Sequence, residues 1–466
     1  MKKIYLQLIL LIFILISCET SQKKEQEPMQ SNSPFQFMIL SPGHFHAGLV
    51  LKNMYPSVDT TVYLYAPEGP ETDDFLNRIK QYNTRDENPT AWVTEIYRGP
   101  DFLDKMIAEK QGNVMVTAGN NKRKTEYIKA AIDAGINVLA DKPMAIDVDD
   151  FELLKSAFEA AEANDLLLYD IMTERYEITT ILQKEFSQID EIFGDLLKGT
   201  PQEPSITKES VHHFSKVVSG KPLVRPSWFF DVSQQGEGIV DVTTHLVDLI
   251  QWECYPEQVL NYEEDVEIMN AKRWATELTF NQFNKVTKME SYPEFLLKDV
   301  VNDSLLNVYA NGEITFRLKD TYAKASVIWN YEAPEGAGDT HYSMMRGSKA
   351  NLIIRQGEEQ NFTPELYIEP NTVTMDELKQ NVETNLAQIT NNYEGVTISE
   401  EENRLKVNIP EKYRLGHEAH FGQVAEKYLD FLNKGKLPEW EVPNMLTKYY
   451  ITTHALEIAK INTSDQ

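Results

Sequence analysis

The feature that most constrains the fold is a regular alternation of short apolar runs and helical segments between residues 35 and 170. Five runs rich in aliphatic and aromatic residues are predicted to be buried strands: 37–40, 61–65, 113–118, 138–140 and 166–169. Residues with helical spacing lie between them, at 47–54, 75–82, 101–109, 125–134 and 149–163. Such alternation is typical of a doubly wound parallel sheet with helices on its faces. We therefore predict a Rossmann-like α/β domain over residues 35–170.

The pattern changes beyond Asp170. Helical segments are expected at 176–186, 241–252, 413–432 and 446–459, and alternating strands at 305–309, 313–317, 325–329 and 351–354. Residues 171–466 are thus predicted to form an α+β domain with an open, mainly antiparallel sheet, which would bind substrate and mediate oligomerisation. Two segments rich in Glu, Asn and Lys, 256–302 and 371–412, are interpreted as insertions in this domain.

The N-terminus predicts export. Lys2 and Lys3 precede an apolar run over residues 4–16, which is typical of a signal-peptide core and too short to span a bilayer. The run ends in Leu-Ile-Ser-Cys, which resembles a bacterial lipobox. Residues 1–18 are therefore predicted to be a lipoprotein signal peptide with Cys18 lipidated, although an ordinary cleaved signal with a chance cysteine is the alternative.

The residues that follow support an envelope location. Residues 19–34 are polar and predicted to be a disordered tether. The charged residues 23–27 look like the export signal that sends some Bacteroidetes lipoproteins to the cell surface. A solvated linker would have the same composition. We expect a membrane-anchored lipoprotein on the periplasmic or cell-surface side of a Gram-negative envelope. No later stretch is apolar enough to span the membrane, so the lipid anchor would be the sole membrane attachment.

Charge and cysteine content exclude two classes of protein. The formal net charge of −27 argues against nucleic-acid binding, because phosphate contacts need a cationic footprint. Once Cys18 is lipidated, Cys254 is left without a partner, so no disulfide framework is expected.

Two motifs carry the predicted chemistry. Asp141-Lys142-Pro143 follows the fourth strand, where parallel sheets bind their ligands. About a hundred residues later, Asp241 and His245 lie four apart, on one face of a predicted helix. A lysine, an aspartate and a histidine brought together supply what proton transfer at a hydroxyl carbon needs while a nicotinamide takes the hydride. In this order the two motifs resemble the Gfo/Idh/MocA family of sugar and cyclitol oxidoreductases.

The resemblance implies an NAD(P)-dependent oxidoreductase that acts on a secondary hydroxyl of a carbohydrate, glycoside or cyclitol. In that family's pattern Lys142 would hydrogen-bond the substrate hydroxyl and lower its pKa. His245 would be the general acid–base, because the ordinary pKa of histidine suits proton exchange near neutral pH. Asp241 would orient the imidazole or the substrate. Asp248 matches the family as well and is interpreted as structural.

The cofactor-binding residues are predicted at the ends of three strands. After the first strand, only Gly43 fits the G-x-G-x-x-G pattern, so the approach to the pyrophosphate is assigned to Ser41, Gly43, His44, Phe45 and His46. The turn after the third strand takes the place of the family's Thr-Pro-Asn and would border the nicotinamide ribose through Ala118, Gly119, Asn120 and Asn121, together with Asp141 and Lys142. NAD is favoured over NADP, because no Lys or Arg lies between Lys52 and Arg78 to meet a 2′-phosphate.

Further residues are assigned to the substrate side. Arg175 and Tyr176 resemble the family's junction between domains, where they would line the cleft or anchor the second domain. Trp228 would stack on a sugar ring or pack in the core, and His213 is a further candidate. A carboxylate–imidazole metal site is conceivable if several histidines converge, but their spacings match no zinc signature and no metal is predicted; these residues are His212, His213, His341, His417 and His420.

Export limits how a nicotinamide could be used. No pool of free nicotinamide is maintained outside the cytoplasm, so the cofactor is expected to be tightly bound and recycled in each turnover. One alternative is a redox-neutral NAD-dependent glycosidase, in which oxidation, elimination and reduction succeed one another. Another is a non-catalytic carbohydrate-binding lipoprotein. The expected partners are a small-molecule carbohydrate and further copies of the chain in a homo-oligomer.

Overall fold

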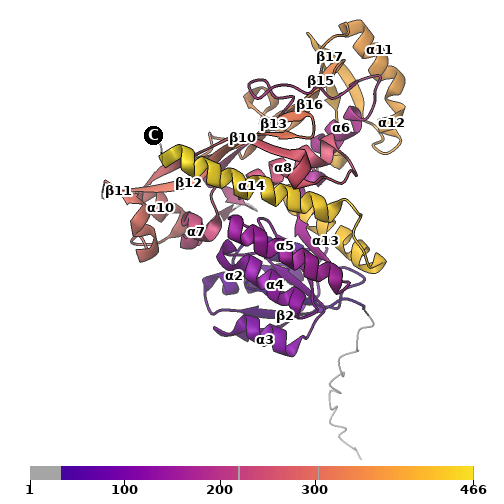
Figure 1. Ribbon diagram of the computed structural model, residues 1–466. Helices are drawn as coiled ribbons and strands as arrows, with labels where there is room; N and C mark the ends of the chain where they lie inside the picture. The colour runs from indigo at the N-terminus through magenta and orange to yellow at the C-terminus, as the bar shows by residue number, and fades with distance from the viewer. Residues whose placement is uncertain (1–32, 219–220, 303, 465–466) are drawn as a thin grey trace, which may run out of the picture. The chain divides into compact units, whose positions relative to one another are not determined.

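The computed structural model describes residues 33–218, 221–302 and 304–464. The predicted signal peptide, Cys18 and all but the end of the predicted tether lie outside the described residues. The described chain builds two large sheets, one from the indigo and purple part of the chain in Figure 1 and one from the magenta to orange part.

The first sheet is parallel and has the strand order β3-β2-β1-β4-β5-β6. Its strands are β1 (Phe37–Leu40), β2 (Thr61–Ala66), β3 (Val93–Arg98), β4 (Val114–Thr117), β5 (Asn137–Asp141) and β6 (Leu168–Ile171). The order reverses between β1 and β4, so their carboxyl ends flank the crevice where doubly wound sheets bind ligands. The predicted Rossmann-like sheet is confirmed.

Strand β3 was missed by the sequence analysis, which counted five strands. It forms an edge of the sheet and pairs only with β2 among the described strands. Val93 and Ile96 are 52% and 49% exposed, so the strand lacks the continuous buried apolar run that marks its neighbours.

The helices that connect these strands are α1 (His46–Val50), α2 (Pro70–Thr84), α3 (Phe102–Glu109), α4 (Lys124–Asp133) and α5 (Val148–Ala163), with a 3₁₀ turn η1 (Asn121–Arg123) before α4. Helix α1 is shorter than predicted. The Tyr55 hydroxyl donates to the carbonyl oxygen of Val50 at 2.6 Å and so satisfies a terminal carbonyl where the helix stops. Asp147 caps α5, because its side chain accepts from the backbone N–H of Asp150.

The second sheet has ten strands, nine of them in the order β10-β12-β13-β7-β14-β15-β16-β18-β17, and β11 pairs with β12. All neighbours are antiparallel except β7 and β13, which confirms the mainly antiparallel prediction. The strands are β7 (Ile206–Ser215), β10 (Val266–Thr279), β11 (Val300–Val301), β12 (Leu305–Leu318), β13 (Thr321–Glu332), β14 (Thr340–Arg346), β15 (Ala350–Arg355), β16 (Glu365–Pro370), β17 (Thr397–Glu401) and β18 (Arg404–Asn408). A separate hairpin pairs β8 (Val217–Val218) with β9 (Lys221–Pro222).

The segment 256–302, interpreted from the sequence as an insertion, contributes a long strand to the second sheet. Strand β10 pairs with β12 along nearly all of its length, with two register shifts. Its exposed positions include Glu267, Lys272 and Glu277, which interrupt the apolar pattern and hid the strand in the sequence. The segment 371–412 likewise contributes β18 to the sheet, besides β17 and the helices α11 (Met375–Asn385) and α12 (Ala387–Thr390).

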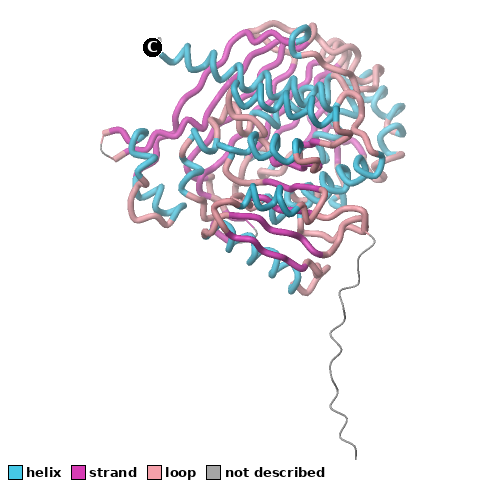
Figure 2. The backbone as a smooth tube through the Cα atoms, turned by 60° about the horizontal axis from the view of Figure 1, so that its bottom comes forward, coloured by secondary structure: helices cyan, strands magenta, loops and turns pink. Residues whose placement is uncertain are grey.

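Helices of the C-terminal part join the two sheets. The remaining α-helices in the described parts of the chain are α6 (Ile178–Ser187), α7 (Val232–Gln235), α8 (Thr243–Cys254), α9 (Tyr262–Asp265), α10 (Phe280–Thr287), α13 (His417–Lys434) and α14 (Glu441–Ser464). Helix α14 contacts β10 and α8 as well as α5, and α13 contacts α1 and β6. Figure 2 shows such helices, in cyan, lying against the magenta strands. No helix in the described parts of the chain is long and apolar enough to cross a membrane.

Candidate active site

A cavity of about 1030 Å³ lies at the carboxyl ends of β1, β4 and β5 and is closed on its other side by residues of the second sheet. This volume is at the upper end of the usual range for ligand pockets. Nine of the residues predicted for cofactor binding or catalysis line it: His44, Phe45, His46, Gly119, Asn121, Asp141, Lys142, Asp241 and His245. The two sequence motifs therefore meet in one cavity, although one follows strand β5 and the other lies about a hundred residues later, at the start of helix α8 (Thr243–Cys254).

The closest contact between the motifs is an ion pair. The Lys142 ammonium lies 2.6 Å from Oδ1 of Asp241, and only 10% and 7% of the two side chains are exposed. The amide of Gln235 donates to Oδ2 of Asp241 at 3.1 Å. Burial opposes ionisation of Asp241, but the charge and hydrogen bond of Lys142 outweigh it and hold the pKa of Asp241 below its usual value. Asp241 therefore orients the lysine.

A second lysine braces the strand end that carries Lys142. Lys124 is buried, and its ammonium donates to the carbonyl oxygens of Asp141 at 2.9 Å and Pro143 at 3.2 Å. Burial lowers the pKa of Lys124 to about 8. Lys124 had no assigned role in the sequence, and these bonds show that it positions the backbone on both sides of Lys142.

His245 lies in the first turn of α8 and faces the same cavity. Its Nδ1 is buried and has no partner within the described part of the chain. Burial, followed by the positive charge of Lys142, lowers the pKa of His245 to about 3. The imidazole is therefore neutral at pH 7 and can accept a proton, whereas the sequence predicted titration near neutral pH. Asp241 lies in the turn just before α8, because the helix begins two residues later than predicted.

The predicted cofactor turn brings two imidazoles to Asp141. Nδ1 of His46 lies 2.9 Å and Nδ1 of His44 3.9 Å from Oδ2 of Asp141. The rings of the two histidines meet edge to face with centroids 4.0 Å apart. Burial lowers the pKa of His44 and of His46 well below the usual value, so both imidazoles are neutral at pH 7. Neither imidazole was expected to reach the strand end that carries Lys142.

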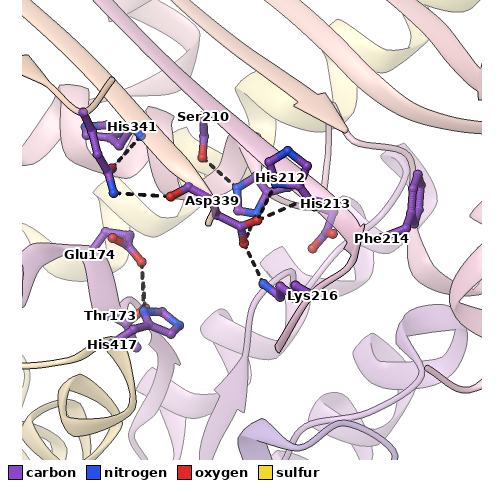
Figure 3. Close-up of polar contacts among 12 residues, drawn as sticks. Thr173, Glu174, Ser210, His212, His213, Phe214, Lys216, Asp339, His341 and His417 are labelled. Carbon is purple, nitrogen blue, oxygen red and sulfur yellow. Dashed lines mark hydrogen bonds and ion pairs between the residues drawn. The ribbon is translucent and has the colours of Figure 1, made fainter. Parts of the chain in front are cut away.

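A second group of polar residues surrounds Asp339, which the sequence analysis missed (Figure 3). Asp339 accepts from Lys216 at 2.6 Å and from Nδ1 of His213 at 3.2 Å, and Nδ1 of His212 lies 3.2 Å away. The signal for this residue was the glycine-containing loop before β14, which carries a carboxylate to the start of a strand. Asp339, Lys216 and His212 line the cavity, whereas His213 does not.

The five histidines considered for a metal site do not form one group among the described residues. Two of them, His212 and His213, meet at Asp339. His417 instead lies with Nδ1 3.3 Å from Oε1 of Glu174, a second cavity residue that the sequence analysis missed (Figure 3). His341 and His420 also line the cavity, and each has one buried ring nitrogen without a partner in the described chain.

Several predicted site residues lie outside the cavity lining: Ser41, Gly43, Ala118, Asn120, Arg175, Tyr176, His213 and Trp228. Trp228 is half-buried and packs beside the turn at Gly43. Arg175 is buried and makes two hydrogen bonds of 2.7 Å to Asp248. This arrangement agrees with the anchoring alternative for Arg175 and with the structural interpretation of Asp248.

The histidines predict a pH dependence of stability. Burial lowers the pKa of His245 and His341 to about 3 and that of His420 to about 4. An unfolded histidine titrates near 6.5, so the unfolded chain binds more protons below that pH, and stability falls as pH drops through this window. Between pH 6.5 and 5.5 the free energy of unfolding should fall by about 1 kcal/mol less in His341→Gln than in the wild type. Urea unfolding at both pH values checks this, and an equal loss in the variant and the wild type would contradict it.

Comparison with known proteins identifies the family. Residues 182–460 match the family described as "Putative oxidoreductase C terminal domain". The crystal structure of a putative oxidoreductase from Parabacteroides merdae ATCC 43184 is 54% identical in sequence, covers 92% of this chain and 98% of its own, and superposes with a TM-score of 0.90. The chain therefore belongs to this oxidoreductase family. No curated protein matches it.

More distant structures share the fold. Levoglucosan dehydrogenase in complex with NADH is 13% identical, covers 91% of this chain and 97% of its own, and has a TM-score of 0.58. GenD2 from gentamicin A biosynthesis, in complex with NAD, is 13% identical, covers 93% and 97%, and has a TM-score of 0.54. The fold is the one shared by the Gfo/Idh/MocA oxidoreductases, which confirms the resemblance drawn from the two sequence motifs.

Proposed function

We propose that this oxidoreductase uses NAD to transfer a hydride to or from a secondary hydroxyl carbon of a carbohydrate, glycoside or cyclitol. The observation that carries the proposal is the meeting of Lys142, Asp241 and His245 in one cavity at the carboxyl end of the parallel sheet. An ammonium held in place and a neutral imidazole are the two groups that proton transfer at such a carbon needs.

The residues at the crevice fit a dinucleotide. Oδ1 of Asn121 is buried without a partner in the described chain, so it offers a polar atom to a ligand. His44 follows β1 and Asn121 follows β4, the two strands that flank the crevice of this sheet. Structures that share the fold hold NADH or NAD, which supports the same cofactor here. Asn121 and the backbone of the turn after β1 would hold it.

A bound nicotinamide would supply or accept the hydride. The Lys142 ammonium, fixed by Asp241 at 2.6 Å, would hydrogen-bond the reacting oxygen and stabilise its negative charge. The imidazole of His245 would take the hydroxyl proton when the alcohol is oxidised, and Lys142 would hold the resulting carbonyl oxygen. In the opposite direction the proton would return to the oxygen along the same path.

A carbohydrate fits the polar character of the cavity. Carboxylates and imidazoles line it on the side of the second sheet, among them Glu174, His341 and Asp339. Such side chains exchange hydrogen bonds with the many hydroxyls of a sugar. A structure with the same fold holds levoglucosan together with NADH, which supports this substrate class.

Retention of cofactor during purification tests the proposal. Because an exported protein meets no maintained nicotinamide pool, we expect the purified protein to keep NAD(H) through gel filtration. Denaturation followed by mass spectrometry of the released small molecules would show it. Absence of nicotinamide, together with no binding at millimolar NAD by calorimetry, would refute the NAD-dependent function.

We also propose that the chain is anchored in the envelope through lipid on Cys18. The support is the lipobox-like sequence that ends at this residue. Cys18→Ala should release the protein from the membrane fraction or leave it as a precursor, because the acyl chains supply the membrane affinity. Fractionation and immunoblotting measure this, with Cys254→Ala as the matched control that should stay anchored. Stable membrane association of Cys18→Ala would contradict the proposal.

A further inference from the structure

The turn after β1 and the end of β5 together place three potential metal ligands within reach of one point. A ring nitrogen of His44, a ring nitrogen of His46 and a carboxylate oxygen of Asp141 all lie within 4.8 Å of one another. In the described parts of the chain this is the one group of three such residues that does so. Two imidazoles and one carboxylate form a ligand set typical of divalent first-row transition metals.

Hydrogen bonding explains only half of this arrangement. The 2.9 Å contact between His46 and Asp141 is a normal hydrogen bond. Nδ1 of His44, at 3.9 Å from the same carboxylate oxygen, is too far away for one and has no other partner in the described chain, although it is buried. A buried polar atom without a partner is costly. A cation between the two imidazoles and the carboxylate would satisfy this atom.

The Asp141 carboxylate is not needed by the neighbouring lysines. Lys142 is paired with Asp241, and Lys124 donates to the main-chain oxygen of Asp141. The side chain of Asp141 therefore faces the two imidazoles of His44 and His46.

The backbone is built so that the turn reaches across the sheet. Strand β4 lies between β1 and β5, so the two histidines must pass over its end to reach Asp141. Gly119 follows β4, and a Cβ atom there would lie 2.5 Å from the carbonyl oxygen of Ser41 and 2.8 Å from the nitrogen of Gly43. The absence of a side chain at Gly119 thus lets the two loops close on each other.

We propose that His44, His46 and Asp141 bind a divalent transition-metal cation, such as zinc or manganese, that borders the cavity holding Lys142. Three protein ligands leave further coordination positions open, as in metal sites that bind ligands from solution. All three residues line the cavity, so its contents can reach the open positions. The class of ligand would be an oxygen donor, and if the proposed function holds, a hydroxyl or carbonyl oxygen of the carbohydrate.

Equilibrium dialysis of the full-length protein, freed of any histidine tag and stripped with EDTA, tests the site. We expect about one equivalent of Zn²⁺ to bind at micromolar concentration, measured by mass spectrometry of the metal. His44→Ala and His46→Ala should each weaken binding at least about tenfold, because one of three ligands is lost. The matched control is His454→Ala on α14, whose ring nitrogen contacts the carbonyl oxygen of Tyr450 at 3.0 Å, and it should bind as the wild type does.

A diffraction measurement needs no variant and decides the matter if either alanine variant fails to fold. Wild-type crystals soaked in zinc should show an anomalous peak about 2.0–2.2 Å from the two Nδ1 atoms and the carboxylate oxygen. No wild-type binding below millimolar zinc, a peak elsewhere only, or equal affinity in all variants would overturn the proposal. Both measurements are made without NAD or sugar, so a negative result would leave the proposed oxidoreductase function standing.

Discussion

Lys142→Met should lower turnover by at least about a hundredfold, the usual contribution of a positioned proton-transfer group. The ammonium is held 2.6 Å from Asp241 and is one of two groups in the cavity placed to act on a substrate hydroxyl. Methionine keeps much of the length of the side chain but cannot donate a hydrogen bond. The rate is followed as reduction of the bound cofactor, which raises the absorbance of the nicotinamide, when a panel of glycosides and cyclitols is added.

His245→Ala should cause a loss of similar size, and the double variant should lose little more than either single one. Both groups act on the same proton at the same carbon, so their contributions are not additive. NAD binding should survive His245→Ala, because that residue belongs to α8 on the substrate side of the cavity. If both single variants reduce the cofactor at the wild-type rate, Lys142 and His245 have only a structural role.

Two controls separate chemistry from folding in this experiment. Lys198→Met alters a lysine that is 72% exposed and paired with Asp320, so it should leave turnover unchanged. Lys142→Met leaves Asp241 buried without its cation, which costs stability. Lys142→Met/Asp241→Asn removes that uncompensated charge, and it should fold better than the single variant yet stay equally inactive.

The sequence predicted the parallel sheet well because its interior strands are continuous apolar runs. Residues 37–40 and 114–117 are buried at every position, so their burial is visible as an unbroken run of letters. The edge strand β3 and the long strand β10 have one solvated face, and their polar residues concealed them. Strands that are buried on both faces could therefore be predicted from the sequence, whereas these two strands with a solvated face could not.

The sequence predicted the site residues that belong to the two motifs. It did not predict the isolated residues that the fold brings to the same cavity from elsewhere in the chain. Lys142 and His245 were assigned from sequence and line the same cavity. Asp339 reaches it from the loop before β14 and Glu174 from the turn after β6, and neither residue belongs to one of the two motifs. The meeting of His44 and His46 with Asp141 depends on how β1, β4 and β5 align in the sheet, which the sequence does not specify.

The other large effect is expected at Arg175, whose replacement by methionine should lower the free energy of unfolding by about 3–5 kcal/mol. Arg175 donates two hydrogen bonds of 2.7 Å to Asp248 on α8 and two of 3.2 Å to Glu441 on α14. Lys448 also contacts Asp248, at 2.8 Å, so Asp248 keeps one cation when Arg175 is replaced. Glu441 is therefore the carboxylate that loses more of its charge compensation. Breaking a buried network leaves charges without compensation, and this cost exceeds the modest worth of an exposed pair.

Urea unfolding of Arg175→Met beside Arg317→Met measures this difference. Arg317 forms a 2.8 Å pair with Glu267 in which 32% and 55% of the side chains are exposed, so its loss should cost at most about 1 kcal/mol. Equal effects of the two variants would contradict an anchoring role for Arg175. Arg175→Met also decides between the two roles that the sequence left open for Arg175, lining the cleft or anchoring the second domain. If Arg175→Met retains wild-type turnover at temperatures where it is folded, the residue anchors the two sheets and does not bind substrate.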